Sequence, residues 1–265
     1  MAAIEIISGS VTAPGSTLQV TSPVIGDTYQ IKNVPTDSKI MLAGIWANTR
    51  AAGFISLTSP QLHDTTVGMK MSVTPNNQYP ILFGSPNQEM VPNDILTVKL
   101  SGSSTSTNVE QLSMLLYYSD FPGINQNLIS MEEVNQRIWD IKTTSITITP
   151  TASNTYSGTK TLNADENIFN AKREYALIGY TITGNCTSIA LRGPDTSNTR
   201  IGMPGISKAY DLTPKFFIHL SEKLGVPCIP LINPENRSAT FVEILQNETL
   251  TPVTIDFIFA ALVIE

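Results

Sequence analysis

The stretch IMLAGIW at residues 40–46 returns later in the chain as YALIGYT at residues 175–181, an offset of 135 residues. Both versions place a glycine at the fifth position of an apolar run. Two further pairs of segments follow at an offset of 134: GFISLTSP at 53–60 with TSIALRGP at 187–194, and TTVGM at 65–69 with TRIGM at 199–203. Matching segments in the same order are typical of an internal repeat. We therefore predict that the chain is a duplication of one unit.

Other landmarks agree with this duplication. Pro80 and Pro214 lie 134 residues apart, and the pair Val91-Pro92 corresponds to Val226-Pro227 at an offset of 135. Each copy ends in an apolar run, VEQLSMLLYY at 109–118 and VTIDFIFAALV at 253–263. The offset grows to about 144 at these runs, so the second copy is expected to carry a longer loop before its last strand.

Short strands separated by turn residues are expected throughout both copies. Alternating polar and apolar residues, as in 96–100 and 146–149, are typical of half-buried strands, and clusters of Pro, Asn, Gly and Asp separate them. The expected strands span 4–7, 28–34, 40–47, 53–58, 67–73, 79–83, 95–100 and 109–118, then 144–149, 155–162, 175–183, 187–191, 207–212, 216–220, 228–232, 239–246 and 253–263. This pattern predicts an all-β chain of two tandem jelly-roll-like β-sandwiches, residues 1–129 and 142–265.

A short linker helix is expected between the two units, over residues 130–141. Ser130 and Glu133 have the spacing of a capping box, in which each side chain satisfies a backbone N–H at the start of a helix. Apolar residues fall on one face of the predicted helix: Met131, Val134, Ile138 and Ile141. We expect this face to pack across both sandwiches; docking to a partner or a membrane is the alternative.

A second helix signal spans residues 213–227. Thr213-Pro214 would start the helix, and Gly225 followed by Pro227 would end it. The corresponding segment of the first copy predicts the start of a strand. A strand followed by a helix is therefore also compatible with this segment.

Charge is sparse in this chain. Only 14% of residues are charged, and the formal net charge is −6. Ser, Thr and Asn make up about 28% instead. The acidic balance argues against a protein that grips a phosphate backbone. No apolar stretch reaches the length of a membrane span, and residues 1–14 show no signal peptide, so we expect a protein folded in a reducing cytoplasm.

The sequence contains few groups suited to catalysis. Two histidines cannot supply a three-histidine metal site, and the common motifs for nucleophiles, phosphate loops and dinucleotides are absent. His63-Asp64 is the nearest approach to a catalytic pair, but adjacent side chains diverge on an extended chain. His219 is expected at or near the surface. Cys186 and Cys228 are expected to be buried free thiols.

Carboxylates could in principle hydrolyse a glycoside or an amide. The candidates are Asp64, Asp94, Glu110, Asp195 and Glu243. None has a counterpart in the other copy that would mark a shared site. We therefore expect no enzyme, and we assign no catalytic, cofactor-binding or metal-ligating residue.

Two further features have both a binding and a structural interpretation. The corresponding segments 59–69 and 193–203 could be paired binding loops, but their Gly and Pro residues favour tight structural connections. Four aromatic residues could be sugar platforms: Trp46, Tyr117, Tyr118 and Trp139. We expect core packing for all four.

A duplicated jelly roll of this length resembles the double jelly-roll major capsid proteins of icosahedral, often membrane-containing DNA viruses, and in size those of the small lipid-containing bacteriophages. The resemblance covers the whole chain but is architectural, and no family-specific motif is matched. It implies two jelly rolls side by side and three chains in a pseudo-hexagonal homotrimer. It further implies a lattice of such trimers, with minor capsid proteins or an inner viral membrane as further partners.

The leading hypothesis is therefore a structural virion protein, made in the host cytoplasm and located in the capsid. No cofactor is expected. Direct nucleic-acid binding is not expected, because the basic N-terminal arm of RNA-binding single jelly-roll capsids is absent. Two alternatives stay open. One is another β-rich module, such as a phage spike, a decoration protein or a carbohydrate-binding module; the other is a twin-jelly-roll glycan amidase.

Overall fold

A computed structural model of the chain describes residues 1–61, 68–75, 81–83, 88–205, 212–247 and 250–264. These residues are mostly β-sheet, with 47% of them in strands and 10% in helices. The strands form antiparallel sheets accompanied by two short α-helices. We number the sheets 1 to 4 in the order in which they stack.

Sheets 1 and 2 are built from the first half of the chain. Sheet 1 has the order β2–β9–β5–β6, and sheet 2 has the order β3–β1–β10–β4–β7, with β8 also paired to β4. The strands of sheet 1 are β2 (Gln19–Val20), β5 (Gly53–Thr58), β6 (Met69–Val73) and β9 (Thr97–Leu100). Those of sheet 2 are β1 (Ala3–Thr12), β3 (Ser22–Pro23), β4 (Ile40–Asn48), β7 (Ile81–Leu82), β8 (Gln88–Met90) and β10 (Val109–Tyr118).

Sheets 3 and 4 are built from the second half, together with β11, which lies just before it in the sequence. Sheet 3 has the order β13–β18–β15–β16, and sheet 4 has the order β11–β17–β14–β19–β12. The strands of sheet 3 are β13 (Tyr156–Thr161), β15 (Ser188–Arg192), β16 (Ile201–Pro204) and β18 (Phe241–Leu245). Those of sheet 4 are β11 (Leu128–Ile129), β12 (Ile138–Ile148), β14 (Arg173–Thr183), β17 (Ile229–Ile232) and β19 (Val253–Val263).

The two halves share one strand order. In sheet 2 the first long strand, β1, pairs with the last, β10, and β10 pairs with β4; in sheet 4, β12, β19 and β14 pair in the same way. The order of sheet 1 likewise matches that of sheet 3, strand for strand. Sheet 2 therefore corresponds to sheet 4, and sheet 1 to sheet 3.

The repeated glycine lies beside an irregularity in this pairing. The register of β10 with β4 shifts next to Ala43, and the register of β19 with β14 shifts next to Ile178, which is the corresponding residue. The glycines that follow, Gly44 and Gly179, each lie against a neighbouring segment. A β-bulge with glycine is a common way to bend a strand where another backbone comes close.

These two glycines differ in what a methyl group would meet. At Gly179 it would collide with the backbone carbonyl oxygens of Thr213 and Pro214, whereas at Gly44 it would lie 2.9 Å from the end of the Leu82 side chain, which can move. We expect Gly179→Ala to lower the free energy of unfolding by about 2 kcal/mol and Gly44→Ala to change it by less than about 1 kcal/mol. Chemical denaturation of both variants measures this, and equal effects would show that the contact at Gly179 is not rigid.

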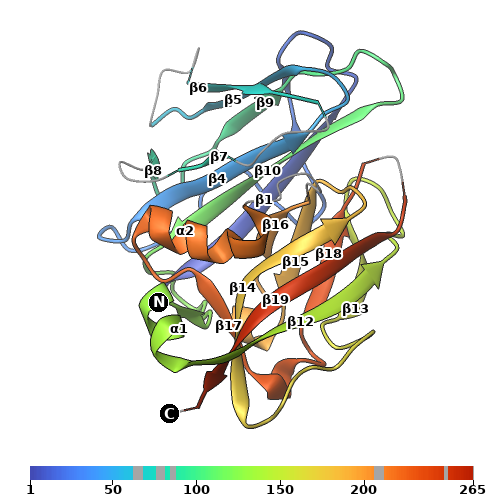
Figure 1. The fold of residues 1–265 in the computed structure, drawn as a ribbon. Helices are drawn as coiled ribbons and strands as arrows, with labels where there is room; N and C mark the ends of the chain where they lie inside the picture. The colour runs from blue at the N-terminus through green and yellow to red at the C-terminus, as the bar shows by residue number, and fades with distance from the viewer. Residues whose placement is uncertain (62–67, 76–80, 84–87, 206–211, 248–249, 265) are drawn as a thin grey trace.

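The four sheets stack in the order 1, 2, 3, 4 (Figure 1). Apolar side chains between sheets 1 and 2 form one core, which includes Ile7, Ile55 and Leu112. A second and larger core fills the space between sheets 3 and 4 and continues to sheet 2, where it includes Ile6 and Trp46. Sheet 2 is therefore packed on both of its faces, so nearly all of β4 and β10 is buried.

The linker helix is shorter than the sequence predicts. Helix α1 spans Met131–Arg137, and Ser130 caps it by accepting a hydrogen bond from the Glu133 backbone N–H at 3.1 Å. The chain turns extended at Ile138 and begins β12, which pairs with β19. Ile138 and Ile141 are therefore exposed strand residues and not part of a helix face. Ile138 and Ile141 have the spacing of a helix face, but backbone pairing of their segment with the long strand β19 stabilises a strand in its place.

The second helix signal is confirmed. A short 3-10 turn at Thr213–Lys215 leads into helix α2, Phe216–Leu224, which ends at Gly225 in the left-handed conformation with φ of 68°. The strand expected at 216–220 is therefore wrong, because Phe216, Phe217 and Leu220 bury a helical face against β14 and β17.

Most of the long predicted strands are confirmed, and the misses are short or irregular segments. Residues 28–34 form only a single bridge, between Gln30 and Ile95, in place of a strand. The strand expected at 207–212 lies largely outside the described residues. Strand β16 at Ile201–Pro204 was not predicted, because its Gly and Pro are typical of turns.

Candidate functional site

The contact between sheets 2 and 3 contains a set of buried polar interactions that joins the two halves. Trp46, on β4, is fully buried there. Its indole N–H donates to the carbonyl oxygen of Thr187 at 2.9 Å and to the Ser188 hydroxyl at 3.0 Å. Gly202 on β16 lies so close to Ile6 on β1 that a side chain would not fit. The two sheets thus meet through both apolar packing and specific hydrogen bonds.

A chain of hydroxyl groups crosses the centre of this contact. Ser113 Oγ lies 2.7 Å from Ser8 Oγ and 2.6 Å from Ser188 Oγ. Ser8 Oγ in turn lies 2.9 Å from the Tyr156 hydroxyl. All four residues are buried. Buried hydroxyls cost free energy unless they are paired, and here each one is paired across the junction or along it.

Amide side chains extend this network toward the ends of β10 and β18. Gln111 donates to Asn154 Oδ1 at 2.7 Å and to the carbonyl oxygen of Gln246 at 3.1 Å. Its own side-chain oxygen accepts a hydrogen bond from Thr187. Uncharged groups such as these can be buried without the desolvation cost of ions. This explains how a chain rich in Ser, Thr and Asn can hold its two halves together.

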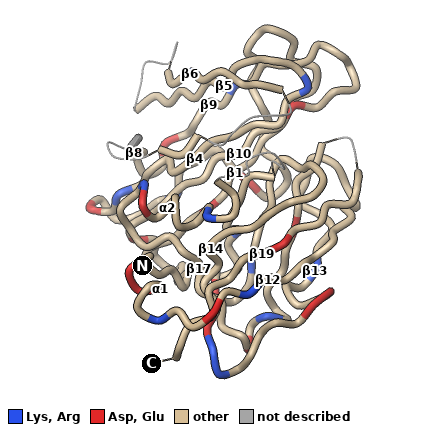
Figure 2. The backbone as a smooth tube through the Cα atoms, in the orientation of Figure 1, with Lys and Arg blue, Asp and Glu red and all other residues tan. Residues whose placement is uncertain are grey.

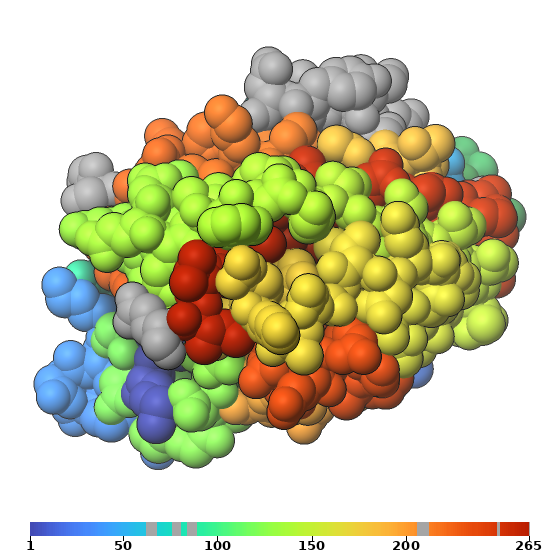
Figure 3. Space-filling view, turned by 60° about the horizontal axis from the view of Figure 1, so that its bottom comes forward, coloured from blue at the N-terminus to red at the C-terminus, as the bar shows by residue number. Residues whose placement is uncertain are grey.

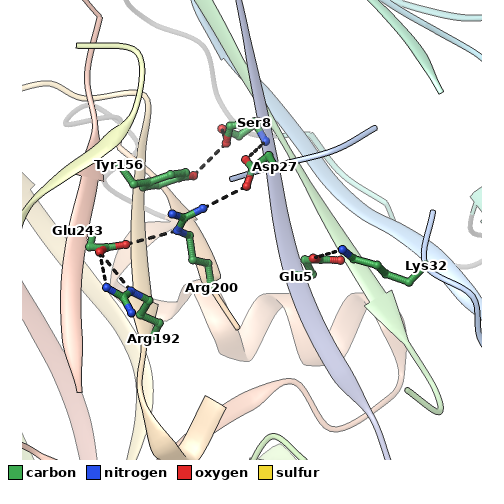
Figure 4. A network of polar contacts seen from close by, with 9 residues as sticks. Glu5, Ser8, Asp27, Lys32, Tyr156, Arg192, Arg200 and Glu243 are labelled. Carbon is green, nitrogen blue, oxygen red and sulfur yellow. Dashed lines mark hydrogen bonds and ion pairs between the residues drawn. The ribbon is translucent and has the colours of Figure 1, made fainter. Parts of the chain in front are cut away.

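Charged groups line the side of the junction, as Figure 4 shows. Arg200, just before β16, donates to Asp27 Oδ1 at 3.1 Å and to Glu243 Oε2 at 3.3 Å. Arg192 donates to Glu243 Oε1 at 3.0 Å, and the Ser8 backbone N–H donates to Asp27 Oδ2 at 2.7 Å. The Arg200 guanidinium also lies 4.7 Å from the centre of the Tyr156 ring. Arg200 therefore links Asp27 of the first half to Glu243 of the second.

Burial disfavours the charged form of each of these carboxyls, and their charged neighbours decide the direction of the net pKa shift. Burial raises the pKa of Asp27 to about 6, although the Ser8 N–H and Arg200 favour its charged form. Burial also raises the pKa of Glu5, against the attraction of Lys32. Burial opposes the charge of Glu243 as well, but Arg192 and Arg200 outweigh it and hold the pKa of that carboxyl below its usual value.

A cavity of about 350 Å³ opens beside these groups. Its lining residues are Glu5, Ile6, Gly26, Asp27, Arg192, Asn198, Thr199 and Arg200. Both arginines in the lining are engaged by Asp27 or Glu243, so opposite charges neutralise one another within the wall. This arrangement is suited to holding two surfaces together, because both arginines form ion pairs with carboxylates of the protein itself.

The described catalytic candidates of the sequence lie in different elements of the fold. His63 and Asp64 lie outside the described residues. His219 is on α2, with Nδ1 3.5 Å from Glu222. Cys186 and Cys228 are buried free thiols, as predicted, and burial raises the pKa of both well above the usual value.

The remaining candidate carboxylates serve different local structures. Glu110 accepts hydrogen bonds from the backbone N–H groups of Arg50 and Ser103, both at 2.7 Å. Asp195 accepts from the side chains of Asn127 and Asn236, both at 2.9 Å. Asp94 accepts from the Ile95 N–H, and Glu243 belongs to the arginine network described above. Because each holds a loop or strand in its own part of the fold, they do not converge on one centre.

The aromatic candidates divide into buried and exposed residues. Trp46, Tyr117 and Tyr118 are buried, as predicted. Trp139 is 68% exposed on β12, so its predicted core position is wrong. The Arg173 guanidinium lies 4.8 Å from the centre of the Trp139 ring. The reason is again the early start of β12, which places Trp139 on an edge strand and not on a helix.

Sequence reasoning missed Ser8, Asp27, Tyr156 and Arg200 as junction residues. Arg200 lies within the segment 193–203. The repeated glycine and proline of this segment indicate a tight turn, and they give no sign that the charge of Arg200 matters. The available signal was the low charge content, because an isolated arginine next to a short strand is conspicuous in such a chain. Its partner could not be identified, since Asp27 is 173 residues away.

Over the molecule as a whole, charges of both signs are mixed. Figure 2 shows acidic and basic positions interspersed over both halves. In the part of the chain that the structure describes, no helix is long and apolar enough to cross a membrane. The same residues contain no group of three His, Cys, Asp or Glu side chains placed to hold a metal ion.

Comparisons with known proteins give little guidance. No family model matches the sequence, and no curated protein matches it either. Among solved structures, the PBSX exported protein XepA is similar over 96% of this chain and 86% of its own, with 10% sequence identity and a TM-score of 0.25.

Proposed function

We propose that this chain is a tandem duplication of a jelly roll and acts as the shell-forming major capsid protein of a virus, assembled as homotrimers. The observation that carries the proposal is the strand order, which occurs twice. In each half the first long strand lies beside the last in one sheet, and the strands between them are divided between that sheet and a facing one. A jelly roll would have such a division of strands, so the strand order supports the proposal.

The matching irregularity in β4 and β14 supports descent of both halves from one unit. Their register shifts fall at corresponding residues, Ala43 and Ile178. A bulge is a specific feature of one strand position, and a fold reached independently in each half would have no reason to place it twice at the same point.

The chemistry of the junction also suits a shell protein. Hydroxyl groups, amide groups and the ion pairs of Arg200 join the two halves. The carboxylates of Glu110 and Asp195 hold nearby loops and strands in place. Interfaces built from such groups can be buried between subunits without desolvating many charges. The acidic balance, with a net charge of −6, suits a shell separated from the genome, with minor capsid proteins or an inner membrane as neighbours.

Assembly of purified protein tests this proposal. We expect concentrated protein to form closed shells or flat hexagonal arrays, visible by negative-stain electron microscopy. Protein that stays a monomer at high concentration over a range of salt and pH would overturn it. Gln111→Leu, which removes the amide from the junction within one chain, is a useful comparison because it should weaken the subunit without touching its outer faces.

An adhesive or carbohydrate-binding module is the second candidate, and exposed Trp139 favours it. Ile138 and Ile141 in the first part of β12 and Val263 at the end of β19 are exposed as well. Figure 3 shows the surface around α1 and β12, drawn in green, beside the red C-terminal residues. Binding to a glycan array that disappears in Trp139→Ala would support this function. A blank array would count against it, and Trp46 is too deeply buried to take part.

A further inference from the structure

Two outer faces of the protein correspond to the two faces that meet between sheets 2 and 3. Sheet 4 corresponds to sheet 2, and sheet 1 corresponds to sheet 3. Within the chain, one face of sheet 2 packs against one face of sheet 3, and this contact joins the two halves. The corresponding faces of sheets 4 and 1 are the outer faces of the two outermost sheets, at opposite ends of the stack (Figure 1).

Single residues can be matched between these faces. Ser113 pairs with Ser8 and Trp46 across sheet 2, and Asp256 pairs with Ser145 and Thr181 across sheet 4. Asp256 therefore has the position of Ser113. On the other side, Phe54 has the position of Ser188, since the aligned segments differ by 134 residues.

The strand pairing extends this match to charged residues. Lys99 pairs with Ser56 on sheet 1, and Glu243 pairs with Ala190 on sheet 3. Ser56 and Ala190 are corresponding residues at the same offset of 134, so Lys99 has the position of Glu243.

The outer face of sheet 4 is accessible, and around Asp256 it is polar. Thr143, Thr147 and Thr181 are exposed on it, and Asp256 is half-buried between Ser145 and Thr181, whose hydroxyls both donate to its carboxylate. The alternate residues of the same strands, such as Ile146 and Phe257, are buried toward sheet 3. This face is rich in hydroxyl groups, as is the face of sheet 2 that packs inside the chain.

The outer face of sheet 1 differs in its charge. Val20 is 60% exposed and Phe54 is 40% exposed on this face. The Lys70 ammonium lies 4.2 Å from the centre of the Phe54 ring, and Lys99 is half-buried beside these residues. The described charges of this face are therefore basic, whereas Asp256 gives the face of sheet 4 an acidic centre. Opposite charges on two surfaces favour their association and fix its direction.

From this correspondence we infer that a second copy of the chain docks the outer face of its sheet 1 onto the outer face of sheet 4. The inference rests on the proposed function, and it deepens that function by naming the faces that meet. The contact is head-to-tail, because two different surfaces join. Such contacts close into a ring where the rotation permits and otherwise form a filament. A ring of three chains repeats one type of sheet contact six times, three within chains and three between them.

The docking geometry places Asp256 of one copy against Phe54 of the next. Within the chain the corresponding side chains, Ser113 and Ser188, have their oxygens 2.6 Å apart. Cysteines at these corresponding positions are therefore expected to lie within disulfide reach. The native cysteines do not interfere, since both are buried.

A double variant carrying Phe54→Cys and Asp256→Cys tests the inference. After mild oxidation we expect a covalent trimer on a non-reducing gel, while each single variant stays a monomer on the same gel. Ser113→Cys with Ser188→Cys is the matched control, because its disulfide forms inside one chain. It should leave the mass on the gel unchanged and block two thiols from labelling.

The outcomes separate the inference from the proposed function. A native trimer that gives no cross-link would overturn the named faces and leave the trimer standing. A ladder longer than three chains would support the faces and contradict the closed trimer. Native monomers without cross-links would contradict both.

Charge reversal gives an independent measurement on the same faces. Asp256→Lys would set like charges against Lys70 and Lys99, and we expect it to weaken self-association about tenfold. Adding Lys99→Glu to that variant should restore most of the loss. Lys223→Glu, on α2 outside both faces, is the control and should have no effect. Circular dichroism confirms that each variant is folded, and folded variants with unchanged association would overturn the inference.

Discussion

Replacing Trp46 with alanine is expected to lower the free energy of unfolding by about 3–5 kcal/mol. The indole is fully buried where sheet 2 meets sheet 3, and its N–H satisfies the Thr187 carbonyl oxygen and the Ser188 hydroxyl. The truncation removes apolar contacts and also leaves these buried acceptors without a donor. Urea denaturation followed by circular dichroism measures the loss.

The other tryptophan provides the matched control. Trp139 is 68% exposed, so Trp139→Ala should change the free energy of unfolding by less than about 0.5 kcal/mol. Because both substitutions remove one indole, the difference between their losses in free energy of unfolding measures the contribution of the contacts of Trp46 between sheets 2 and 3. Similar losses in both variants would show that Trp46 does not hold the two halves together.

Asp27 should make the protein less stable as the pH rises. The pKa of this carboxyl is raised from 3.8 to about 6 in the folded protein, chiefly by burial. A raised pKa means that the folded state favours the protonated form. The resulting stability is complete below about pH 3.8 and is lost as the pH passes through about 6. The shift corresponds to about 3 kcal/mol in total, of which about 2 kcal/mol falls between pH 4.5 and pH 8.

Asp27→Asn isolates this effect, because asparagine cannot ionise. Relative to the wild-type chain, the variant should gain about 2 kcal/mol of stability between pH 4.5 and pH 8. Glu5 and Glu243 titrate in both proteins, so their contributions largely cancel in the comparison. Glu243 acts in the opposite direction: its pKa is lowered, so its stability is present above about pH 4.5 and lost in stronger acid. Parallel stability curves for the two proteins would contradict the raised pKa of Asp27.

Much of the fold could be predicted from local sequence. The alternation in residues 146–149, the long apolar runs at 109–118 and 253–263, and the repeated glycine in 40–46 and 175–181 all mark strands that the structure contains. These signals are strong because β4, β10 and β19 are long and buried, so nearly every residue along them is selected for packing. Long, strongly patterned elements are the ones that sequence indicates best.

Helix boundaries and the candidate site depended on distant partners and could not be predicted. Ile138 and Ile141 have helical spacing from Val134, but β19 offers a long strand edge, and pairing with it ends α1 at Arg137. Arg200 and Asp27 form their ion pair across 173 residues. No local pattern encodes such a contact, because it arises only when sheets 2 and 3 are stacked.

The native mass of the purified protein tests the central claim most directly. One chain has a mass of 28.8 kDa, and light scattering after size exclusion measures the mass of the particle in solution without reference to its shape. A duplicated jelly roll that builds a shell through its two outer faces should elute as a trimer of about 86 kDa, three times the chain mass. A single species at 28.8 kDa that persists at high concentration would contradict the claim.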